Sequence, residues 1–229
     1  MNSAAPTHFV HTNTRLDTVP LVPEIQLHLA QDVYLVWERT EQQLGQSDQP
    51  PPFWAFAWAG GQALARYVLD HPQLVAGRRV LDLASGSGLV AIAAARAGAA
   101  TVVANEVDRF AIAAIELNAQ ANDVTVIPLL GDLLDEDDDA EVVLAGDVFY
   151  ERPMARRVLA FLDRAHARGA HILVGDPGRA YLPRTRFEVV ATYEVPVPHT
   201  LEDSQVKRTS VLRLTAPTPA TVEPAPTPV

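Results

Sequence analysis

Strand-like and helix-like segments alternate along most of this chain, and this alternation limits the possible folds more than any other feature of the sequence. Short apolar runs typical of buried strands recur between segments with helical spacing. The expected strands are 79–83, 101–106, 124–130, 142–147 and 170–175, and the expected helices are 60–70, 89–97, 109–121 and 152–168. Strands and helices in this order build a parallel sheet with helices on both faces.

The pattern changes after Pro183. Two extended runs, 187–197 and 206–214, follow each other without a helix between them and are expected to form an antiparallel pair at the sheet edge. The link 131–141 is short for a parallel crossover and leaves room for about one helical turn. The predicted fold is therefore α/β, with a doubly wound, mostly parallel, seven-stranded Rossmann-like sheet that ends in an antiparallel hairpin.

The two ends of the chain show no clear period. Residues 1–22 are expected to form a flexible arm, and residues 216–229, almost entirely Pro, Thr, Ala and Val, a disordered tail. A single domain is expected over residues 23–215. Within it, 24–29 is expected to be a short strand and 34–44 a helix.

Composition narrows the classes of function. The chain has 229 residues, a formal net charge of −10 and no cysteine. The negative charge argues against a nucleic-acid partner, which Lys and Arg would have to neutralise, and favours a cationic one. Without cysteine there are no disulfides or thiolate sites, and the seven histidines lack ligand spacing, so no metal site is expected. With neither a long apolar run, nor an apolar signal segment, nor a coiled-coil period, we expect a cytoplasmic monomer that does not enter a membrane.

A glycine-rich turn joins the strand 79–83 to the next helix. Gly86 and Gly88 let the backbone approach a ligand, and the helix N-terminus behind them is electropositive. Residues 86–91 also fit the dinucleotide pattern G-x-G-x-x-G/A. Asp82, however, would repel a pyrophosphate and suits a cation, such as the ammonium and sulfonium of S-adenosylmethionine. Its alternative role is to hydrogen-bond the turn.

Carboxylates also follow the next two strands. Glu106 is placed to accept hydrogen bonds from ribose hydroxyls, a feature shared by nicotinamide and S-adenosylmethionine enzymes. Its alternative is a charge at a helix start, shared with Asp108. Asp132 could bind an adenine amino group while Leu133 supplies a backbone amide. The acidic run 135–139 beside Asp132 is typical of a solvated loop, so a surface role for Asp132 stays open.

The sequence GDVFY at 146–150 follows the fourth strand of the alternation. Carboxyl ends of strands face the ligand crevice in doubly wound sheets, so Asp147 and Tyr150 are the candidate catalytic residues. A carboxylate there can orient the ammonium of an arriving lysine, after which water takes the proton. The alternative is a capping Asp and a core Tyr. Arg179, in the expected turn 176–179, could touch the substrate.

Taken together, these residues resemble the electron transfer flavoprotein β-subunit lysine methyltransferases, a branch of the seven-β-strand protein lysine methyltransferases. The resemblance covers roughly residues 23–214. Besides the glycine motif, it is carried by PEIQL at 23–27, PFWAFAWAGGQAL at 52–64, ANE at 104–106, GDVFY at 146–150 and GDPGR at 175–179. Many methyltransferases share the glycine motif, whereas Asp-x-Phe-Tyr and Trp-x-Gly-Gly-Gln together are much more specific.

The resemblance implies an S-adenosylmethionine-dependent protein-lysine N-methyltransferase whose substrate is the electron transfer flavoprotein β-subunit. Trp58 would pack on the methionine portion of the cofactor, Asp82 and the two glycines of its turn would cradle that portion, and Glu106 would hold the ribose. Asp147 and Tyr150 would form the lysine-side signature.

Two positions depart from the family pattern, and other functions stay open. Ala84 stands where the family usually has Gly, and Ala59 where Pro is common, which concerns cofactor affinity more than the substrate. The first alternative is methylation of another protein, such as a ribosomal protein, or of a small amine. A nicotinamide-dependent oxidoreductase is disfavoured by Asp82 and Asp132. The last alternative is a non-catalytic binding module.

Overall fold

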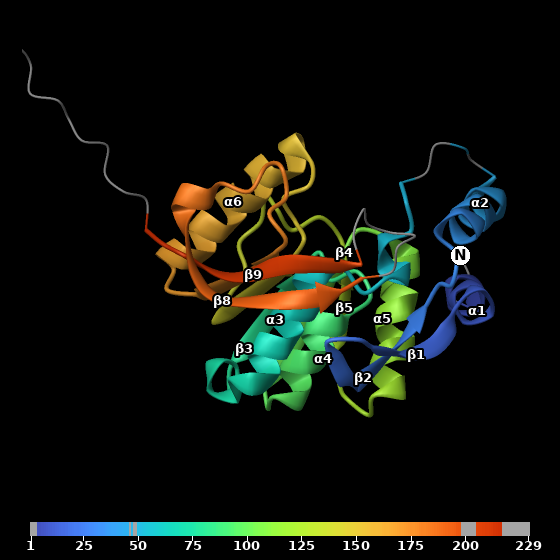
Figure 1. Ribbon diagram of the computed structural model, residues 1–229, viewed down its shortest axis with the longest axis horizontal. Coiled ribbons are helices and arrows are strands. Elements are labelled where there is room, and N and C mark those ends of the chain that lie inside the picture. Colours follow the sequence, from blue (N-terminus) through green and yellow to red (C-terminus); the bar gives the residue numbers. More distant parts are fainter. Residues whose placement is uncertain (1–3, 46, 48–49, 198–204, 217–229) are drawn as a thin grey trace, which may run out of the picture.

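Seven strands form one sheet in the computed structural model, which describes residues 4–45, 47, 50–197 and 205–216 (Figure 1). The strand order is β5-β4-β3-β6-β7-β9-β8. The strands are β3 (Arg79–Leu83), β4 (Thr101–Glu106), β5 (Ile127–Leu130), β6 (Val142–Gly146), β7 (His171–Asp176), β8 (Phe187–Pro196) and β9 (Val206–Leu214). The first five run parallel, and β9 pairs antiparallel with both β7 and β8, so the predicted fold class is confirmed.

Helices cover both faces of this sheet. On one face α3 (Ala59–Asp70), α4 (Leu89–Arg96) and α5 (Arg109–Ala121) pack against alternate strand residues such as Val80 and Leu144. On the other face α6 (Arg152–Ala167) packs against the intervening residues, such as Leu81 and Val143. Figure 1 shows α6 on the opposite side of the β8–β9 ribbon from α3 and α4. Apolar strand residues on both sides therefore build two core layers, as a buried parallel sheet requires.

The parallel register brings the carboxyl ends of the strands together. Leu83 of β3 lies opposite Asn105 of β4 and Ala145 of β6, and Gly146 lies opposite Gly175 of β7. The five parallel strands therefore end at the same edge of the sheet, and the loops that follow them face one crevice. This edge is where doubly wound sheets bind their ligands.

The expected flexible arm over residues 1–22 is wrong for the residues that the structure describes. Residues Ala4–Asn13 form helix α1, and β1 (Arg15–Val19) pairs antiparallel with β2 (Val22–Leu29). Phe9 and Val10 of α1 are buried, and the Phe9 ring lies 4.9 Å from that of Phe110 in α5. These few apolar contacts anchor a segment that shows no helical period in the sequence.

The link between β5 and β6 contains no helix, although space for about one turn was expected. Its acidic residues pair with arginines of α6 instead: Asp135 with Arg157 at 2.6 Å and Asp137 with Arg168 at 2.7 Å. The acidic run is therefore a loop face held by ion pairs.

The N-terminal part also contains the expected helix before residue 45. Helix α2 (Val33–Leu44) begins after Asp32, whose side chain accepts a hydrogen bond from the backbone amide of Leu35. Of the expected disordered tail 216–229, residues 217–229 lie outside the described residues. No helix in the described ranges has the length and apolar character needed to cross a bilayer.

Candidate active site

A cavity of about 350 Å³ opens at the carboxyl ends of β3, β4 and β6, a size within the range of small-molecule sites. Six of the nine predicted site residues line it: Trp58, Asp82, Gly86, Glu106, Asp147 and Tyr150. Gly88 precedes α4 at the end of the same turn and is not part of the lining. Apolar side chains make up much of the remaining lining: Pro50, Pro51, Phe53, Trp54, Phe56, Leu89, Val90, Val107, Ala111, Val148 and Met154.

Asp82 is buried at the end of β3, where its carboxylate organises the glycine turn. Its Oδ2 accepts hydrogen bonds from Ser85 Oγ at 2.5 Å and from the backbone amide of Ala91 at 2.9 Å. The turn-bonding role considered from the sequence is therefore present, and the residue also lines the cavity. Burial raises the pKa of Asp82 to about 7. A cationic ligand beside it would stabilise the charged form.

Glu106, at the end of β4, is held by three backbone amides. Oε1 accepts from Gly86 at 2.9 Å, and Oε2 accepts from Val107 at 2.9 Å and from Asp108 at 3.4 Å. Burial raises the pKa of Glu106 and the three amides act in the opposite direction. The neighbouring Asp108 caps α5, its side chain accepting a hydrogen bond from the amide of Phe110. The two carboxylates thus have separate tasks, and Glu106 is free of the helix-capping role.

The glycine turn has the backbone shape that the sequence predicts. Gly86 and Gly88 have φ of +56° and +82°, in the left-handed region that glycine adopts without steric cost. A Cβ on Gly86 would have only Trp54 Cα near it, at 4.0 Å, so this side of the turn faces open cavity. Ala84, where the family usually has Gly, adopts φ +54° and carries backbone strain.

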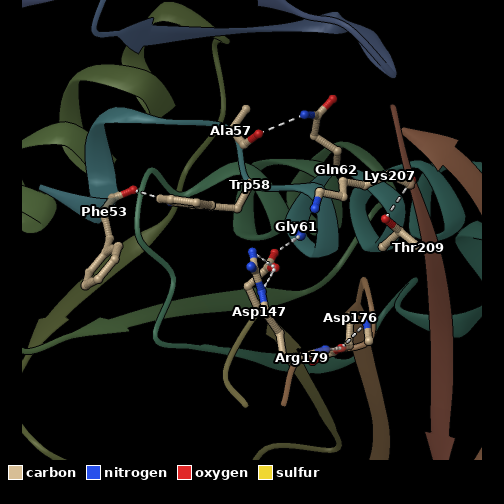
Figure 2. A network of polar contacts seen from close by, with 11 residues as sticks. Phe53, Ala57, Trp58, Gly61, Gln62, Asp147, Asp176, Arg179, Lys207 and Thr209 are labelled. Atoms are coloured by element: carbon tan, nitrogen blue, oxygen red, sulfur yellow. Dashed lines mark hydrogen bonds and ion pairs between the residues drawn. The ribbon is translucent and has the colours of Figure 1, made fainter. Parts of the chain in front are cut away.

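Asp147 follows β6 and is buried with φ +56°. Its Oδ1 accepts hydrogen bonds from Arg179 Nε at 3.1 Å and Nη2 at 2.8 Å, and Oδ2 accepts from the backbone amide of Gly61 at 3.1 Å (Figure 2). Burial raises the pKa of Asp147 to about 6, Arg179 acts to lower it, and the nearby Asp176 acts to raise it. An unusual backbone conformation and a shifted carboxyl pKa in a cavity together mark a functional-site candidate.

Aromatic rings frame the cavity beside Asp147. The Phe53 ring lies 5.8 Å from that of Trp58 and 5.4 Å from that of Tyr150, and Trp58 Nε1 donates to the Phe53 carbonyl oxygen at 2.8 Å. Fully buried Gln62 fixes the loop that carries Trp58, because its Nε2 donates to the Ala57 carbonyl oxygen at 2.7 Å (Figure 2). These contacts give the Trp-x-Gly-Gly-Gln element a structural purpose.

The structure does not bring Asp132 and Leu133 to this cavity. The exposed Asp132 carboxylate pairs with Arg157 at 2.8 Å and accepts a hydrogen bond from the amide of Leu134 at 3.0 Å. Leu133 packs partly buried against the core on the α6 side. The surface role considered for Asp132 from the sequence is the one that the structure shows.

Sequence reasoning missed three contributors to the site. Val107, exposed directly after Glu106, lines the cavity, and so does Phe53. Gly60 lies so close to the carbonyl oxygen of Gly175 and to Asp147 that a Cβ could not be accommodated there. Val107 could have been found as the apolar residue after a strand-end carboxylate, and Phe53 as part of the aromatic run 53–58. The close approach at Gly60 depends on residues far apart in sequence and left no local signal.

Comparisons with known proteins find methyltransferases. The family model for ribosomal protein L11 methyltransferase matches residues 63–148. The electron transfer flavoprotein β-subunit lysine methyltransferase of Danio rerio is 38% identical over 177 residues, which cover 76% of this chain and 67% of the relative. The Xenopus laevis protein of the same name is 37% identical over 182 residues, 78% of this chain and 73% of the relative.

A solved structure supports the fold independently. The magnesium protoporphyrin IX methyltransferase of Synechocystis PCC 6803 with bound SAM aligns with a TM-score of 0.51 at 15% identity, covering 68% of this chain and 78% of that one. Identity this low is informative about the fold alone. The sequence relatives decide the family, and on their identity and coverage the chain belongs to the electron transfer flavoprotein β-subunit lysine methyltransferases.

Proposed function

We propose that this enzyme transfers methyl groups from S-adenosylmethionine to lysine side chains of the electron transfer flavoprotein β-subunit. The observation that carries the proposal is one cavity in which Asp82, Glu106 and Asp147 meet from the ends of three strands. The names of the relatives supply the substrate. Asp82, Gly86 and Glu106 are called the cofactor half of the cavity below, and Trp58, Asp147 and Tyr150 the lysine half. The resemblance assigns Trp58 to the methionine portion of the cofactor; we group it with Asp147 because its ring lies beside Phe53 and Arg179.

The cofactor half fits S-adenosylmethionine by its chemistry. The cavity is largely apolar and its charged lining is mainly acidic, which suits a ligand that carries an ammonium and a sulfonium. Gly86 leaves space on the cavity side of its turn. When bound, the cofactor supplies a methyl group activated by its positively charged sulfur.

Each carboxylate of the cofactor half has a distinct task in this proposal. Asp82 offers a buried carboxylate to the ammonium, where low solvent exposure strengthens the attraction between the charges. Glu106 accepts hydrogen bonds from the ribose hydroxyls, the use that this topology makes of a carboxylate after the second parallel strand. Val107 and Ala111 give the adenine ring apolar neighbours.

The lysine half orients the nitrogen that accepts the methyl group. Asp147 lines the cavity and attracts the lysine ammonium, and the rings of Trp58, Phe53 and Tyr150 surround the aliphatic part of the side chain. Solvent then takes the ammonium proton, leaving a neutral amine as nucleophile. Positioning of this kind accounts for a large share of enzymatic rate enhancement.

The alternatives differ in how well the site supports them. Asp82 at the turn opposes the pyrophosphate of a nicotinamide cofactor. The ribosomal-protein alternative rests on the family model over 63–148. That segment holds the cofactor half and Asp147 but not Trp58, Tyr150 or Arg179. The expected monomeric state and cytoplasmic location stay predictions.

The test is transfer of labelled methyl from S-adenosylmethionine to purified electron transfer flavoprotein, with the label located by mass spectrometry. We expect label on lysines of the β-subunit and a fall of roughly 100-fold or more with Asp147→Asn. Asp163→Asn is the control, because Asp163 pairs with Arg186 outside the cavity. A β-subunit without label would reject the substrate, and label on a ribosomal protein instead would favour the alternative.

A further inference from the structure

Arg179 joins three segments of the lysine half. Its guanidinium donates two hydrogen bonds to Oδ1 of Asp147 and lies 5.8 Å from the centre of the Trp58 ring (Figure 2). The side chain is 21% exposed and lines the cavity. One cation from the loop after β7 therefore contacts the carboxylate after β6 and the indole before α3.

Asp176 sets the position from which Arg179 reaches these groups. Its Oδ1 accepts hydrogen bonds from the backbone amides of Gly178 at 2.6 Å and Arg179 at 2.7 Å, which closes the turn that follows β7. The other oxygen, Oδ2, is buried and has no hydrogen-bond partner among the described residues. The Asp-Pro-Gly-Arg element thus has a purpose beyond forming a turn, since it aims a guanidinium at Asp147.

The hydrogen bonds to the Asp147 carboxylate leave one acceptor site open to a further donor. A carboxylate offers about four acceptor sites. Arg179 takes two on Oδ1 and Gly61 takes one on Oδ2. Among the described residues, nothing bonds to the last site on Oδ2.

The charges of Asp147, Asp176 and Arg179 together also favour a cation. Asp147 and Asp176 carry two negative charges at neutral pH when ionised, and Arg179 carries one positive charge. With both carboxyls ionised, the formal charge of these three side chains is −1, which attracts an incoming ammonium. Arg179 can therefore orient Asp147 while the two carboxylates still attract the ammonium of the substrate lysine.

We infer that Arg179 is a positioning residue for methyl transfer, which fixes the Asp147 carboxylate and the Trp58 ring so that the target lysine meets one open acceptor site. The inference rests on the proposed function for the identity of that lysine. Arg179 acts through Asp147 and Trp58 and takes no part in the proton or methyl transfer. The planar guanidinium is suited to this task because it binds a carboxylate with two parallel donors and also packs on an aromatic face.

The variants Arg179→Gln and Arg179→Lys separate positioning from folding. Methyl transfer to electron transfer flavoprotein is measured at saturating cofactor, together with cofactor affinity and melting temperature. Arg179→Gln is expected to lower kcat about 10- to 100-fold while the Kd for S-adenosylmethionine stays within about threefold. Arg179→Lys should recover part of kcat, because it restores the charge but not the two-donor geometry. An unchanged kcat, or an equal loss of cofactor affinity, would overturn the inference.

Arg186→Gln is the matched control. Arg186 has a side-chain exposure of 19% and binds both oxygens of Asp163, at 3.1 and 2.5 Å, away from the cavity. We expect its loss to lower the melting temperature by an amount similar to that of Arg179→Gln and to leave kcat within about twofold. If both variants lowered kcat equally, Arg179 would be merely structural.

A titration followed by carbon NMR tests the same contact without any turnover. The Asp147 carboxyl signal, assigned by its absence in Asp147→Asn, should titrate at higher pH in Arg179→Gln than in the wild type. Asp176 also acts on Asp147, and it is retained in both proteins. An unmoved titration would overturn the inference. If the titration moved as expected but the wild-type enzyme left electron transfer flavoprotein unlabelled, only the proposed substrate would fail.

Discussion

The two halves of the cavity are held by different kinds of contact. In the cofactor half, Asp82 and Glu106 accept hydrogen bonds from nearby backbone amides and from Ser85. In the lysine half, Asp147 depends on the guanidinium of Arg179 and on the first turn of α3, far away in the sequence. The first half is a local strand–turn–helix device, whereas the second is assembled only when distant loops meet.

The two halves should differ in how they tolerate substitutions elsewhere in the protein. The glycine turn of the cofactor half depends mainly on its own backbone. The lysine half also requires α3 to dock tightly on β6 and β7, because Gly60 lies against Asp147 and Gly175. Substitutions in the docking surface should therefore damage the lysine half first.

The largest effect is expected from Gly60→Ala. The added Cβ would overlap the carbonyl oxygen of Gly175 and lie 2.5 Å from Oδ2 of Asp147. We expect the free energy of unfolding to fall by about 2–3 kcal/mol and the melting temperature by roughly 5–10 °C. Gly61→Ala is the control in the same helical turn, because its Cβ would meet only Leu89 and Val90 at 4.0 Å. Equal melting temperatures for the two variants would show that the docking is loose.

Asp82→Asn should affect the cofactor half alone. Loss of the buried carboxylate is expected to weaken S-adenosylmethionine binding about 10- to 100-fold, the effect of losing a charge-assisted hydrogen bond of about 1.5–3 kcal/mol. At saturating cofactor, kcat should stay within about threefold of the wild type. Calorimetry and steady-state kinetics measure the two quantities. A fall in kcat at saturation as large as the fall in affinity would remove the distinction between the halves.

The smallest effect is the pH dependence of cofactor binding. Burial raises the pKa of Asp82 to about 7, so the carboxylate is charged above that pH and neutral below it. Affinity for the cationic ligand should be full above about pH 7 and should fall as the pH drops, by at most about tenfold per unit. The raised pKa of Glu106 contributes a further decline at lower pH. In Asp82→Asn the change in affinity near pH 7 should disappear. If the change persisted, it would have to arise from the titration of another group.

Much of the sheet could be predicted because its strands are short apolar runs between charged residues or glycines. The bounds 79–83, 101–106 and 206–214 agree with β3, β4 and β9. The N-terminal segment could not be predicted in this way. Among the α1 residues whose burial is described, Phe9 and Val10 are the buried ones, and two apolar neighbours do not establish a helical period.

The site residues that could be predicted also differ from the others in how far away their partners lie in the sequence. Asp82, Gly86 and Glu106 lie where the strand–turn–helix pattern puts them, because their partners are close in sequence or at adjacent strand ends. The pairing of Asp147 with Arg179 spans 32 residues, and the pairing that holds Asp132 at the surface spans 25. Such contacts depend on how loops and helices pack, which a single sequence does not reveal.

The most direct test of the division between the halves is calorimetric titration of S-adenosylmethionine into Asp147→Asn, a substitution of the central residue of the lysine half. The melting temperature of the variant establishes that it is folded. We expect a Kd within about threefold of the wild-type value in a protein whose methyl transfer to electron transfer flavoprotein is reduced by roughly 100-fold or more. A loss of cofactor affinity as large as the loss of transfer would show that Asp147 belongs to the cofactor half and would contradict the account.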